Sequence, residues 1–211
     1  MTTYHDQVLG SSLRTLAPAG IIIDHRLITA GDEHALFAAE ASAFSNSVIQ
    51  VRRASGAVRL VARKLLGNLG YAENALPKSA SGAPIWPTGI VGSLAHDSRV
   101  AIAAVAKSED VSALGIDIEP AEMLPHEMLR IIATPRERER IEQDPYQGRL
   151  LFTAKEAVYK AINPLDHVFL GHQDVEVDFA SRKATVRNGR IVDLKFCIST
   201  HLVTLAFLPA M

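Results

Sequence analysis

The sequence LGIDIEP, which runs from Leu114 to Pro120, combines strand-forming residues with two carboxylates. Val111 to Ile118 is rich in apolar residues and is predicted to be a β-strand, which Pro120 ends. Because side chains alternate along a strand, Asp117 and Glu119 are expected to point to the same side. The segment therefore predicts a pair of acidic side chains at the exit of one strand.

A long helix is predicted from Gln147 to Ile162, and it contains a second decisive segment, LFTAKEAVYK (Leu151 to Lys160). Within this segment Glu156 and Lys160 are one turn apart and share a face of the helix. The helix also has an apolar stripe that would face a core, formed by Leu150, Ala154, Ala157, Val158 and Ala161. The pattern predicts a packed helix that presents one acid and one base together.

The two segments together give a candidate metal site. If the strand exit meets the helix face, Asp117, Glu119 and Glu156 form an all-oxygen site whose mutual repulsion a hard cation would relieve. Mg²⁺ is the best candidate, and since it often completes its shell with substrate phosphates, the implied substrate carries phosphate. Spacing alone leaves a second interpretation open, in which the strand acids are solvated and Glu156 forms an ordinary helical ion pair with Lys160.

Before the acidic strand, the sequence predicts helices and short strands in alternation. The predicted elements are a strand from Gly20 to Ile28, a helix through Ala35, Leu36, Ala39 and Ala43, a helix from about Ala54 to Leu69 that Gly70 ends, a loop from Tyr71 to Gly89, and strands from Ile90 to Leu94 and from Val100 to Lys107. The basic residues of the second helix, among them Arg59 and Arg63, are expected at its start and on faces other than its apolar stripe. Trp86 is interpreted as a packing anchor of the loop.

After the acidic strand, Thr134 is expected to cap a short helix whose residues Arg136 to Arg140 form a solvated face. From Asp174 onward the pattern changes to strands, with Asn188-Gly189 as a hairpin turn, which predicts a β-meander. Hairpin-length connections favour an antiparallel-rich α+β fold over a doubly wound parallel sheet. A polar stretch from Ser108 to Asp110 divides the chain into predicted halves 1–110 and 111–211.

Composition narrows the class of protein. The 211 residues are 48% hydrophobic and 21% charged, which is typical of an ordered globular chain. Cys197 is the only cysteine, which favours a reducing compartment and hence the cytoplasm. The first residues lack a signal-peptide pattern, and the apolar runs are shorter than the roughly 20 residues that span a membrane. A net charge of -1 gives no basic footprint for nucleic acid. We therefore expect neither a membrane nor a nucleic-acid partner.

The two acidic segments resemble the two signature motifs of 4'-phosphopantetheinyl transferases, and their separation along the chain also fits. Three further segments resemble this family: RLVARKLLGNLG (Arg59 to Gly70), IWPTGIVGSLAH (Ile85 to His96) and PLDHVFLG (Pro164 to Gly171). Together they look like the enterobactin-synthetase component D branch, whose members prime siderophore and other secondary-metabolite synthases. The resemblance extends from about Arg52 to Gly171.

The resemblance implies a monomer of two similar α+β halves related by a pseudo-twofold axis, with coenzyme A bound in the cleft between them. By analogy with the family, Asp117, Glu119 and Glu156 hold Mg²⁺ against the pyrophosphate, and Lys160 contacts the phosphate of the departing arm. The positions that match coenzyme A contacts are Arg59, Lys78 and His96, with Ala95 contributing backbone and with Arg52, or its neighbour Arg53, as a looser match. Asp97 stands where many relatives carry cysteine, and the resemblance gives it no role.

The implied reaction is transfer of the phosphopantetheine arm to a serine of a carrier protein. The serine hydroxyl would attack the β-phosphate in line, and adenosine 3',5'-bisphosphate would leave. Because a serine hydroxyl is a poor nucleophile at neutral pH, Glu156, directly or through a water, is the candidate general base. Two alternatives stay open: a magnesium-dependent nucleotide phosphohydrolase that uses the same carboxylates, and a non-catalytic coenzyme A-binding partner of a synthase.

Overall fold

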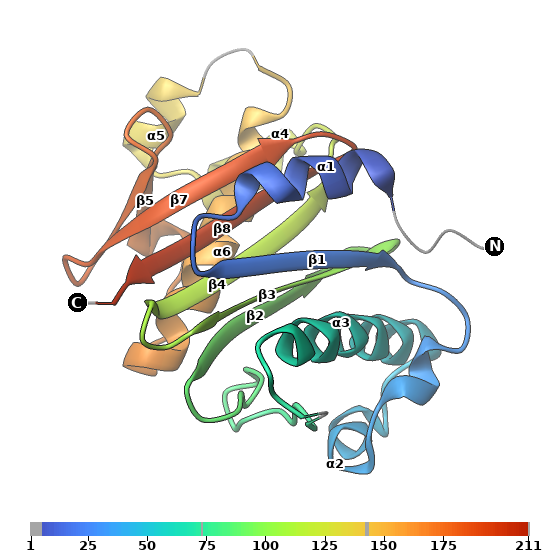
Figure 1. Ribbon diagram of the computed structural model, residues 1–211. Helices are drawn as coiled ribbons and strands as arrows, with labels where there is room; N and C mark the ends of the chain where they lie inside the picture. The colour runs from blue at the N-terminus through green and yellow to red at the C-terminus, as the bar shows by residue number, and fades with distance from the viewer. Residues whose placement is uncertain (1–5, 73, 142–143, 211) are drawn as a thin grey trace.

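The structure of the chain is a computed structural model, which describes residues 6–72, 74–141 and 144–210 (Figure 1). The helices in this part of the chain are α1 (Gln7–Leu16), α2 (Ala38–Ala41), α3 (Ile49–Asn68), α4 (His126–Ile132), α5 (Pro135–Arg140) and α6 (Gln147–Asp166). The strands are β1 (Ile21–Leu27), β2 (Ile90–His96), β3 (Val100–Lys107), β4 (Val111–Pro120), β5 (Val175–Asp178), β6 (Lys183–Val186), β7 (Ile191–Ile198) and β8 (His201–Pro209). Short 3₁₀ turns are η1 (Asp32–Ala35), η2 (Ser42–Phe44) and η3 (His172–Asp174).

The strands form two antiparallel sheets, in the orders β1-β3-β2 and β4-β8-β7-β6-β5. Helix α3 packs against the smaller sheet and α6 against the larger one. In the first half β3 lies between β1 and β2, and in the second half β8 lies between β4 and β7 in the same way. Two similar α+β halves are therefore present, and the predicted α+β class and C-terminal meander are confirmed.

The two halves meet where β2 lies beside β4. The hydroxyl of Ser93 on β2 accepts a hydrogen bond of 3.0 Å from the backbone N–H of Ile116 on β4. A core cluster continues across this junction and contains residues of both sheets and of α1, including Leu9, Ile102 and Leu205. The halves consequently share one hydrophobic core.

Helix α1 is an element that the sequence analysis missed. Asp6 caps it by accepting hydrogen bonds of 3.0 Å from the backbone N–H groups of Val8 and Leu9. Leu9, Leu13 and Leu16 are buried and follow a helical spacing. The cap and this spacing together were the signal that could have identified the helix.

The prediction of one continuous helix through Ala35 to Ala43 is wrong. The chain instead makes η1, α2 and η2, with an extended residue at Leu36 between the first two. Glu40, which is 0% exposed, turns inward and accepts hydrogen bonds from the backbone N–H groups of Phe37 and Leu76. A buried carboxylate needs such donors, and this requirement outweighs the helical pattern.

Glu40 also explains why two arginines of α3, Arg59 and Arg63, are buried. Arg63 donates to both oxygens of Glu40, at 2.9 and 3.2 Å, and Arg59 lies 3.5 Å from the same carboxylate. Arg59 and Arg63 are only 2% and 7% exposed. Helix α3 also begins at Ile49, one turn before the predicted start at Ala54.

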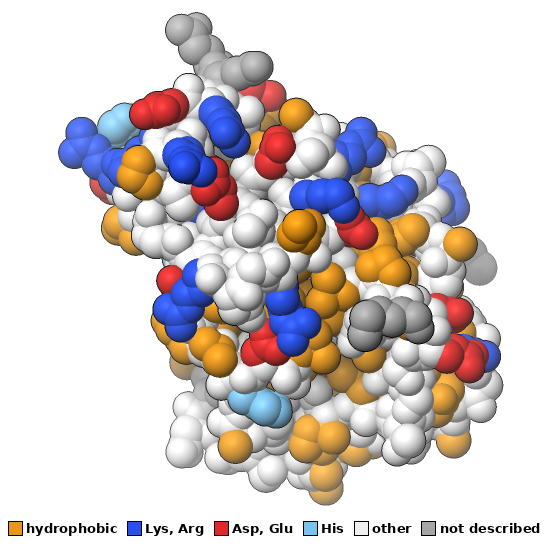
Figure 2. All heavy atoms as spheres, turned by 90° about the vertical axis from the view of Figure 1, so that its left-hand side faces the viewer, with side chains coloured by type: hydrophobic (Ala, Val, Ile, Leu, Met, Phe, Trp, Pro, Cys, Tyr) orange, Lys and Arg blue, Asp and Glu red, His pale blue; other side chains and the backbone are white. Residues whose placement is uncertain are grey.

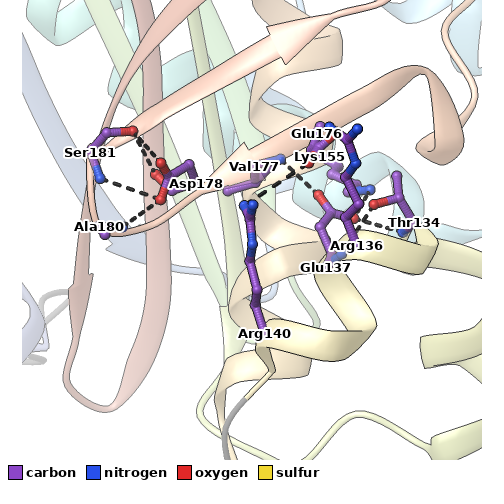
Figure 3. A network of polar contacts seen from close by, with 10 residues as sticks. All are labelled: Thr134, Arg136, Glu137, Arg140, Lys155, Glu176, Val177, Asp178, Ala180 and Ser181. Atoms are coloured by element: carbon purple, nitrogen blue, oxygen red, sulfur yellow. Dashed lines mark hydrogen bonds and ion pairs between the residues drawn. The ribbon is translucent and has the colours of Figure 1, made fainter.

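Helix α5 has the predicted threonine cap, but its face is only partly solvated. Figure 3 shows Glu137 pointing inward to Lys155 of α6, with 2.6 Å between Glu137 Oε2 and Lys155 Nζ. Glu137 also accepts from the backbone N–H groups of Thr134 and Val177. Both charged side chains are buried, so this pair fixes α5 and β5 to α6.

Charged side chains of both signs are mixed on the face shown in Figure 2, and hydrophobic side chains gather near its middle. The described side chains visible there do not form a continuous basic field. Across the described segments of the chain, no helix combines the length and hydrophobicity that crossing a membrane would require.

Candidate active site

A cleft of about 600 Å³ lies between the two halves, with α3 and β2 on one side and α6 and β4 on the other. Arg59, Lys78 and His96 from the first half line it, and Lys160 lines it from the second. Apolar side chains, including Trp86, Leu94 and Leu165, line other parts. A cleft of this volume accommodates a ligand larger than a simple ion.

The acidic strand and the acidic helix meet as the sequence predicts. Gly115 makes this possible, because a Cβ added there would lie 1.9 Å from the carbonyl oxygen of Ala157 on α6. Two residues further along β4, Asp117 Oδ1 accepts a hydrogen bond of 2.6 Å from Lys160 Nζ. The direct contact of helix backbone with strand therefore brings the side chains of Asp117 and Lys160 together.

Asp117 lies where the charged form of its carboxylate is disfavoured. Burial raises its pKa most, the charges of Glu156 and Glu119 raise it further, and Lys160 opposes them, which together put the pKa at about 6. Its Oδ2 is buried and has no hydrogen-bond partner among the described residues. The side chain is thus held near two other acids with one oxygen unsatisfied.

Glu119 and Glu156 each pair with a basic side chain that the sequence analysis left unassigned. Arg149 Nη1 donates to Glu119 Oε2 at 2.8 Å, and Arg149 also donates to the carbonyl oxygen of Met123. His172 Nε2 lies 3.1 Å from Glu156 Oε1. Arg149 is seven residues before Glu156, a two-turn spacing that could have placed it on the same face of α6, whereas His172 lies beyond that helix and gave no such signal.

The donor set is suited to a hard divalent cation, although it is not closed around one. Within residues 6–72, 74–141 and 144–210, no group of three His, Cys, Asp or Glu side chains is gathered as a metal-binding cluster. Asp117, Glu119 and Glu156 instead pair with Lys160, Arg149 and His172. The three carboxylates nevertheless supply the oxygen ligands that Mg²⁺ prefers, and Asp117 Oδ2 is an unsatisfied oxygen among them.

The cationic wall of the cleft combines buried and accessible groups. Arg59 Nε donates to the carbonyl oxygen of Leu76 at 3.0 Å, so part of this guanidinium supports the loop rather than the cleft. Lys78 Nζ lies 4.3 Å from the ring centroid of Phe44, and burial, then the charge of Arg59, lowers the pKa of Lys78. The side chain of His96 is exposed at the end of β2. Desolvation by the atoms packed around its ring lowers the pKa of His96 most, and the charges of Lys160 and Lys78 lower it further.

Arg52 and Arg53 differ in what they contact. Arg53 Nε donates to Glu33 Oε2 at 3.0 Å. Arg52 has no side-chain hydrogen bond or ion pair with the described residues, and it lies seven residues before Arg59, on the same face of α3. This difference favours Arg52 over Arg53 as the residue available to a ligand. Ala95 is buried on β2 and presents only backbone.

Asp97 and Trp86 are accounted for by packing. Asp97 Oδ2 lies 3.0 Å from His201 Nε2, and Asp97 Oδ1 accepts from the backbone N–H groups of Arg99 and Val100. Trp86 lies against Gly92, where an added Cβ would come within 2.6 Å of the indole ring. The expected role of Trp86 as a packing anchor agrees with this contact.

Comparison with known proteins gives one family match in each half of the chain. Residues 39–106 match the family model of the 4'-phosphopantetheinyl transferase N-terminal domain, and residues 113–206 match that of the 4'-phosphopantetheinyl transferase superfamily. The chain is 36% identical over 180 residues to 4'-phosphopantetheinyl transferase Npt of Nocardia iowensis. The aligned residues cover 84% of this chain and 81% of Npt. This chain belongs to the 4'-phosphopantetheinyl transferase superfamily.

Two further phosphopantetheinyl transferases have similar identity. Svp of Streptomyces mobaraensis is 36% identical over 173 residues, which cover 78% of this chain and 70% of Svp. PptT of Mycobacterium tuberculosis is 37% identical over 157 residues, which cover 72% of this chain and 69% of PptT. The chain is therefore an enzyme of the phosphopantetheinyl transferase type. The family uses coenzyme A as substrate, generally with a divalent metal, and acts on carrier proteins.

Proposed function

We propose that this enzyme moves the phosphopantetheine arm of coenzyme A to a serine of an apo carrier protein, with Asp117, Glu119 and Glu156 as the ligands of Mg²⁺. The observation that carries this assignment is the buried, unsatisfied Oδ2 of Asp117, next to two other acids and joined through Lys160 to the cleft. When bound, Mg²⁺ would supply charge stabilisation for the pyrophosphate.

The residues of the first half would bind the nucleotide end of coenzyme A. Lys78, His96 and Arg59 line the cleft, and Arg52 extends the same face of α3. Cationic side chains in a partly enclosed cleft favour phosphate groups. The backbone at Ala95 would complete the contacts beside His96.

The residues of the second half would act at the reacting phosphates. The carrier serine oxygen forms a bond to the β-phosphorus, while the bond from that phosphorus to the bridging oxygen breaks. Adenosine 3',5'-bisphosphate leaves with the electron pair, and Glu156 accepts the serine proton directly or through a water. Lys160 would stabilise the charge that develops on the phosphates, since it lines the cleft and its ammonium group is hydrogen-bonded to Asp117.

Further assignments follow from the resemblance and form part of the same proposal. We place the enzyme in the enterobactin-synthetase component D-like branch, which acts on non-ribosomal peptide, polyketide or fatty-acid synthases in the cytoplasm. We also propose that it is a monomer, divided into halves 1–110 and 111–211. The turn between β3 and β4, and the separation of the two family matches between residues 106 and 113, support this boundary.

The proposal is tested by incubating the protein with coenzyme A, Mg²⁺ and a panel of apo acyl, peptidyl and aryl carrier domains. Intact mass spectrometry should show the addition of one phosphopantetheine to at least one carrier. Glu156→Gln should abolish the addition, and so should EDTA. Glu109→Gln, a matched change at an exposed acid that pairs with Lys107 on the surface, should leave the rate unchanged.

Three outcomes would contradict the proposal. If every carrier class stays unmodified, the transferase assignment fails for these substrates and with it the proposed acceptor. Release of nucleotide or phosphate without a carrier would favour a phosphohydrolase. Calorimetric binding of coenzyme A without turnover on any carrier would favour a non-catalytic partner of a synthase.

A further inference from the structure

We propose that His172 is a positioning residue that orients Glu156, an inference that rests on the proposed function of the acidic site. His172 Nε2 lies 3.1 Å from Glu156 Oε1. An ionised carboxylate only accepts hydrogen bonds, so the ring donates through Nε2. Oε1 is thereby engaged, and Oε2 is the oxygen left to face the cation or the serine proton.

The ring of His172 is held by contacts that do not involve Glu156. It stacks on Phe152 of α6, with 5.7 Å between ring centroids and an angle of 27° between the planes. The backbone carbonyl oxygen of His172 accepts a hydrogen bond of 2.7 Å from Lys155 Nζ. The next residue, Gln173, donates its side-chain amide to the carbonyl oxygens of Ile131 and Ala133. The position of the His172 donor is therefore set by contacts that are independent of Glu156.

Lys155 connects this histidine to the buried network of Figure 3. Its side chain is 1% exposed, and its ammonium group donates three hydrogen bonds: to Glu137 Oε2, to the carbonyl oxygen of Ile132 and to that of His172. Glu137 in turn accepts from the backbone of β5 at Val177. Helices α5 and α6, the 3₁₀ turn η3 and strand β5 are thus joined at one buried point, which sets where η3 presents its histidine.

Glu156 needs such an anchor more than the other two acids do. Its side chain is 31% exposed, whereas that of Asp117 is 10% exposed and already clamped by Lys160. Across the described part of the chain, His172 is the side-chain partner that Glu156 has. A long, partly exposed carboxylate without a partner samples several rotamers, which weakens any interaction that requires one of them. Residues that hold metal-binding side chains typically contribute about 10–100-fold to metal affinity or activity.

The test uses three variants of the full-length enzyme. His172→Phe keeps a ring for stacking on Phe152 but removes the donor. His172→Gln removes the ring but can place an amide donor near the former Nε2. His34→Phe is the control, since His34 is exposed and does not line the cleft. For each variant we would measure Mn²⁺ binding by electron paramagnetic resonance with coenzyme A and no carrier, and kcat and KM for transfer.

We expect His172→Phe to weaken Mn²⁺ binding and to lower kcat about 10–100-fold, while KM for coenzyme A changes less than about threefold. His172→Gln should recover a substantial part of both losses, and His34→Phe should behave as wild type. If His172→Phe binds Mn²⁺ and turns over as wild type does, the positioning role is wrong. If Gln and Phe are equally impaired with a lowered melting temperature, the histidine is only a packing residue. Wild-type protein that modifies no carrier would instead contradict the proposed function itself.

Discussion

Asp97 shows how a residue beside a binding site can serve the fold instead. Its carboxylate turns from the cleft to His201 at the start of β8 and to the backbone of its own turn. Burial alone would raise the pKa of Asp97, but the hydrogen bonds from His201 and from the N–H groups of Val100 and Arg99 outweigh it and lower the pKa. A carboxyl whose pKa is lower in the folded state stabilises that state above its unfolded pKa.

We therefore expect Asp97→Asn to reduce the free energy of unfolding at pH 7.5 by about 1.5–3 kcal/mol, the range for hydrogen bonds to a charged group. The wild-type advantage should persist down to the pKa of this carboxyl in the unfolded chain, which is about 3.8, and disappear as the pH falls through the lower folded pKa. Urea unfolding midpoints between about pH 7.5 and about pH 2 would measure this. A difference between the two proteins that grows toward low pH would contradict the account.

Arg52 and Arg53 allow a paired test of the nucleotide wall. Arg52→Ala should raise KM for coenzyme A about tenfold with little change in kcat, because it removes a charge available to phosphate. Arg53→Ala should leave KM within about twofold, since Arg53 is engaged by Glu33, whose pKa its hydrogen bond lowers to about 2. Steady-state kinetics with an apo carrier that the enzyme is able to modify would decide between them. The reverse order of effects would assign the ligand contact to Arg53.

The residues that a local motif contains were predictable, and those that long-range contacts bring in were not. Asp117 and Lys160 lie in two recognisable segments, and the structure joins them by a 2.6 Å hydrogen bond. His172 and Glu40 act through partners 16 or more residues away in the chain. The sequence around His172 and around Glu40 does not indicate these partners, so the contacts become apparent only in the folded structure.

At the scale of elements, the packing of α6 on β4 depends on Gly115. An alanine Cβ there would meet two backbone atoms, at 1.9 Å from the carbonyl oxygen of Ala157 and at 2.7 Å from the nitrogen of Ala161. Backbone atoms of a packed helix cannot rotate away, so the whole helix would have to shift. Because α6 carries Glu156 and Lys160, such a shift displaces half of the candidate site.

We expect Gly115→Ala to lower kcat by about 100-fold or more, the typical effect of misplacing reacting groups by about 1 Å, and to lower the melting temperature. Gly67→Ala is the matched control on α3, where an added Cβ meets nothing within 4 Å. That change should be neutral or stabilise the protein by about 0.5–1 kcal/mol. Near-wild-type turnover by Gly115→Ala would show that the helix tolerates a different distance from the strand.

Elements with strong local patterns were predicted nearly to their ends. Strands β1, β3 and β4 and helix α6 lie within a few residues of their predicted ranges. The segment between η1 and η2 was predicted wrongly because one buried acid, Glu40, redirects it toward α3. Helix α6 also continues through Pro164, beyond its predicted end at Ile162. Tertiary contacts decided these cases, and propensity did not.

At the scale of the whole molecule, the shared core makes the two halves one folding unit. The cluster that contains Leu9, Ile102, Ile116 and Leu205 joins α1, both sheets and both sides of the cleft. We expect calorimetry to show one cooperative transition, with equal calorimetric and van't Hoff enthalpies. Separate fragments 1–110 and 111–211 should lack the dispersed amide spectra of folded domains. Two resolved transitions would contradict a common core.

The direct contact between Gly115 and α6 has a consequence for engineering the enzyme. The reactive centre and the ligand-facing loop are carried by different parts of the chain, since residues 81–84 and Trp86 line the cleft from outside the helix and strand that meet at Gly115. Randomised libraries can therefore be directed to the loop to alter how coenzyme A is bound. Diversity introduced at 113–117 would mostly yield misassembled, inactive clones.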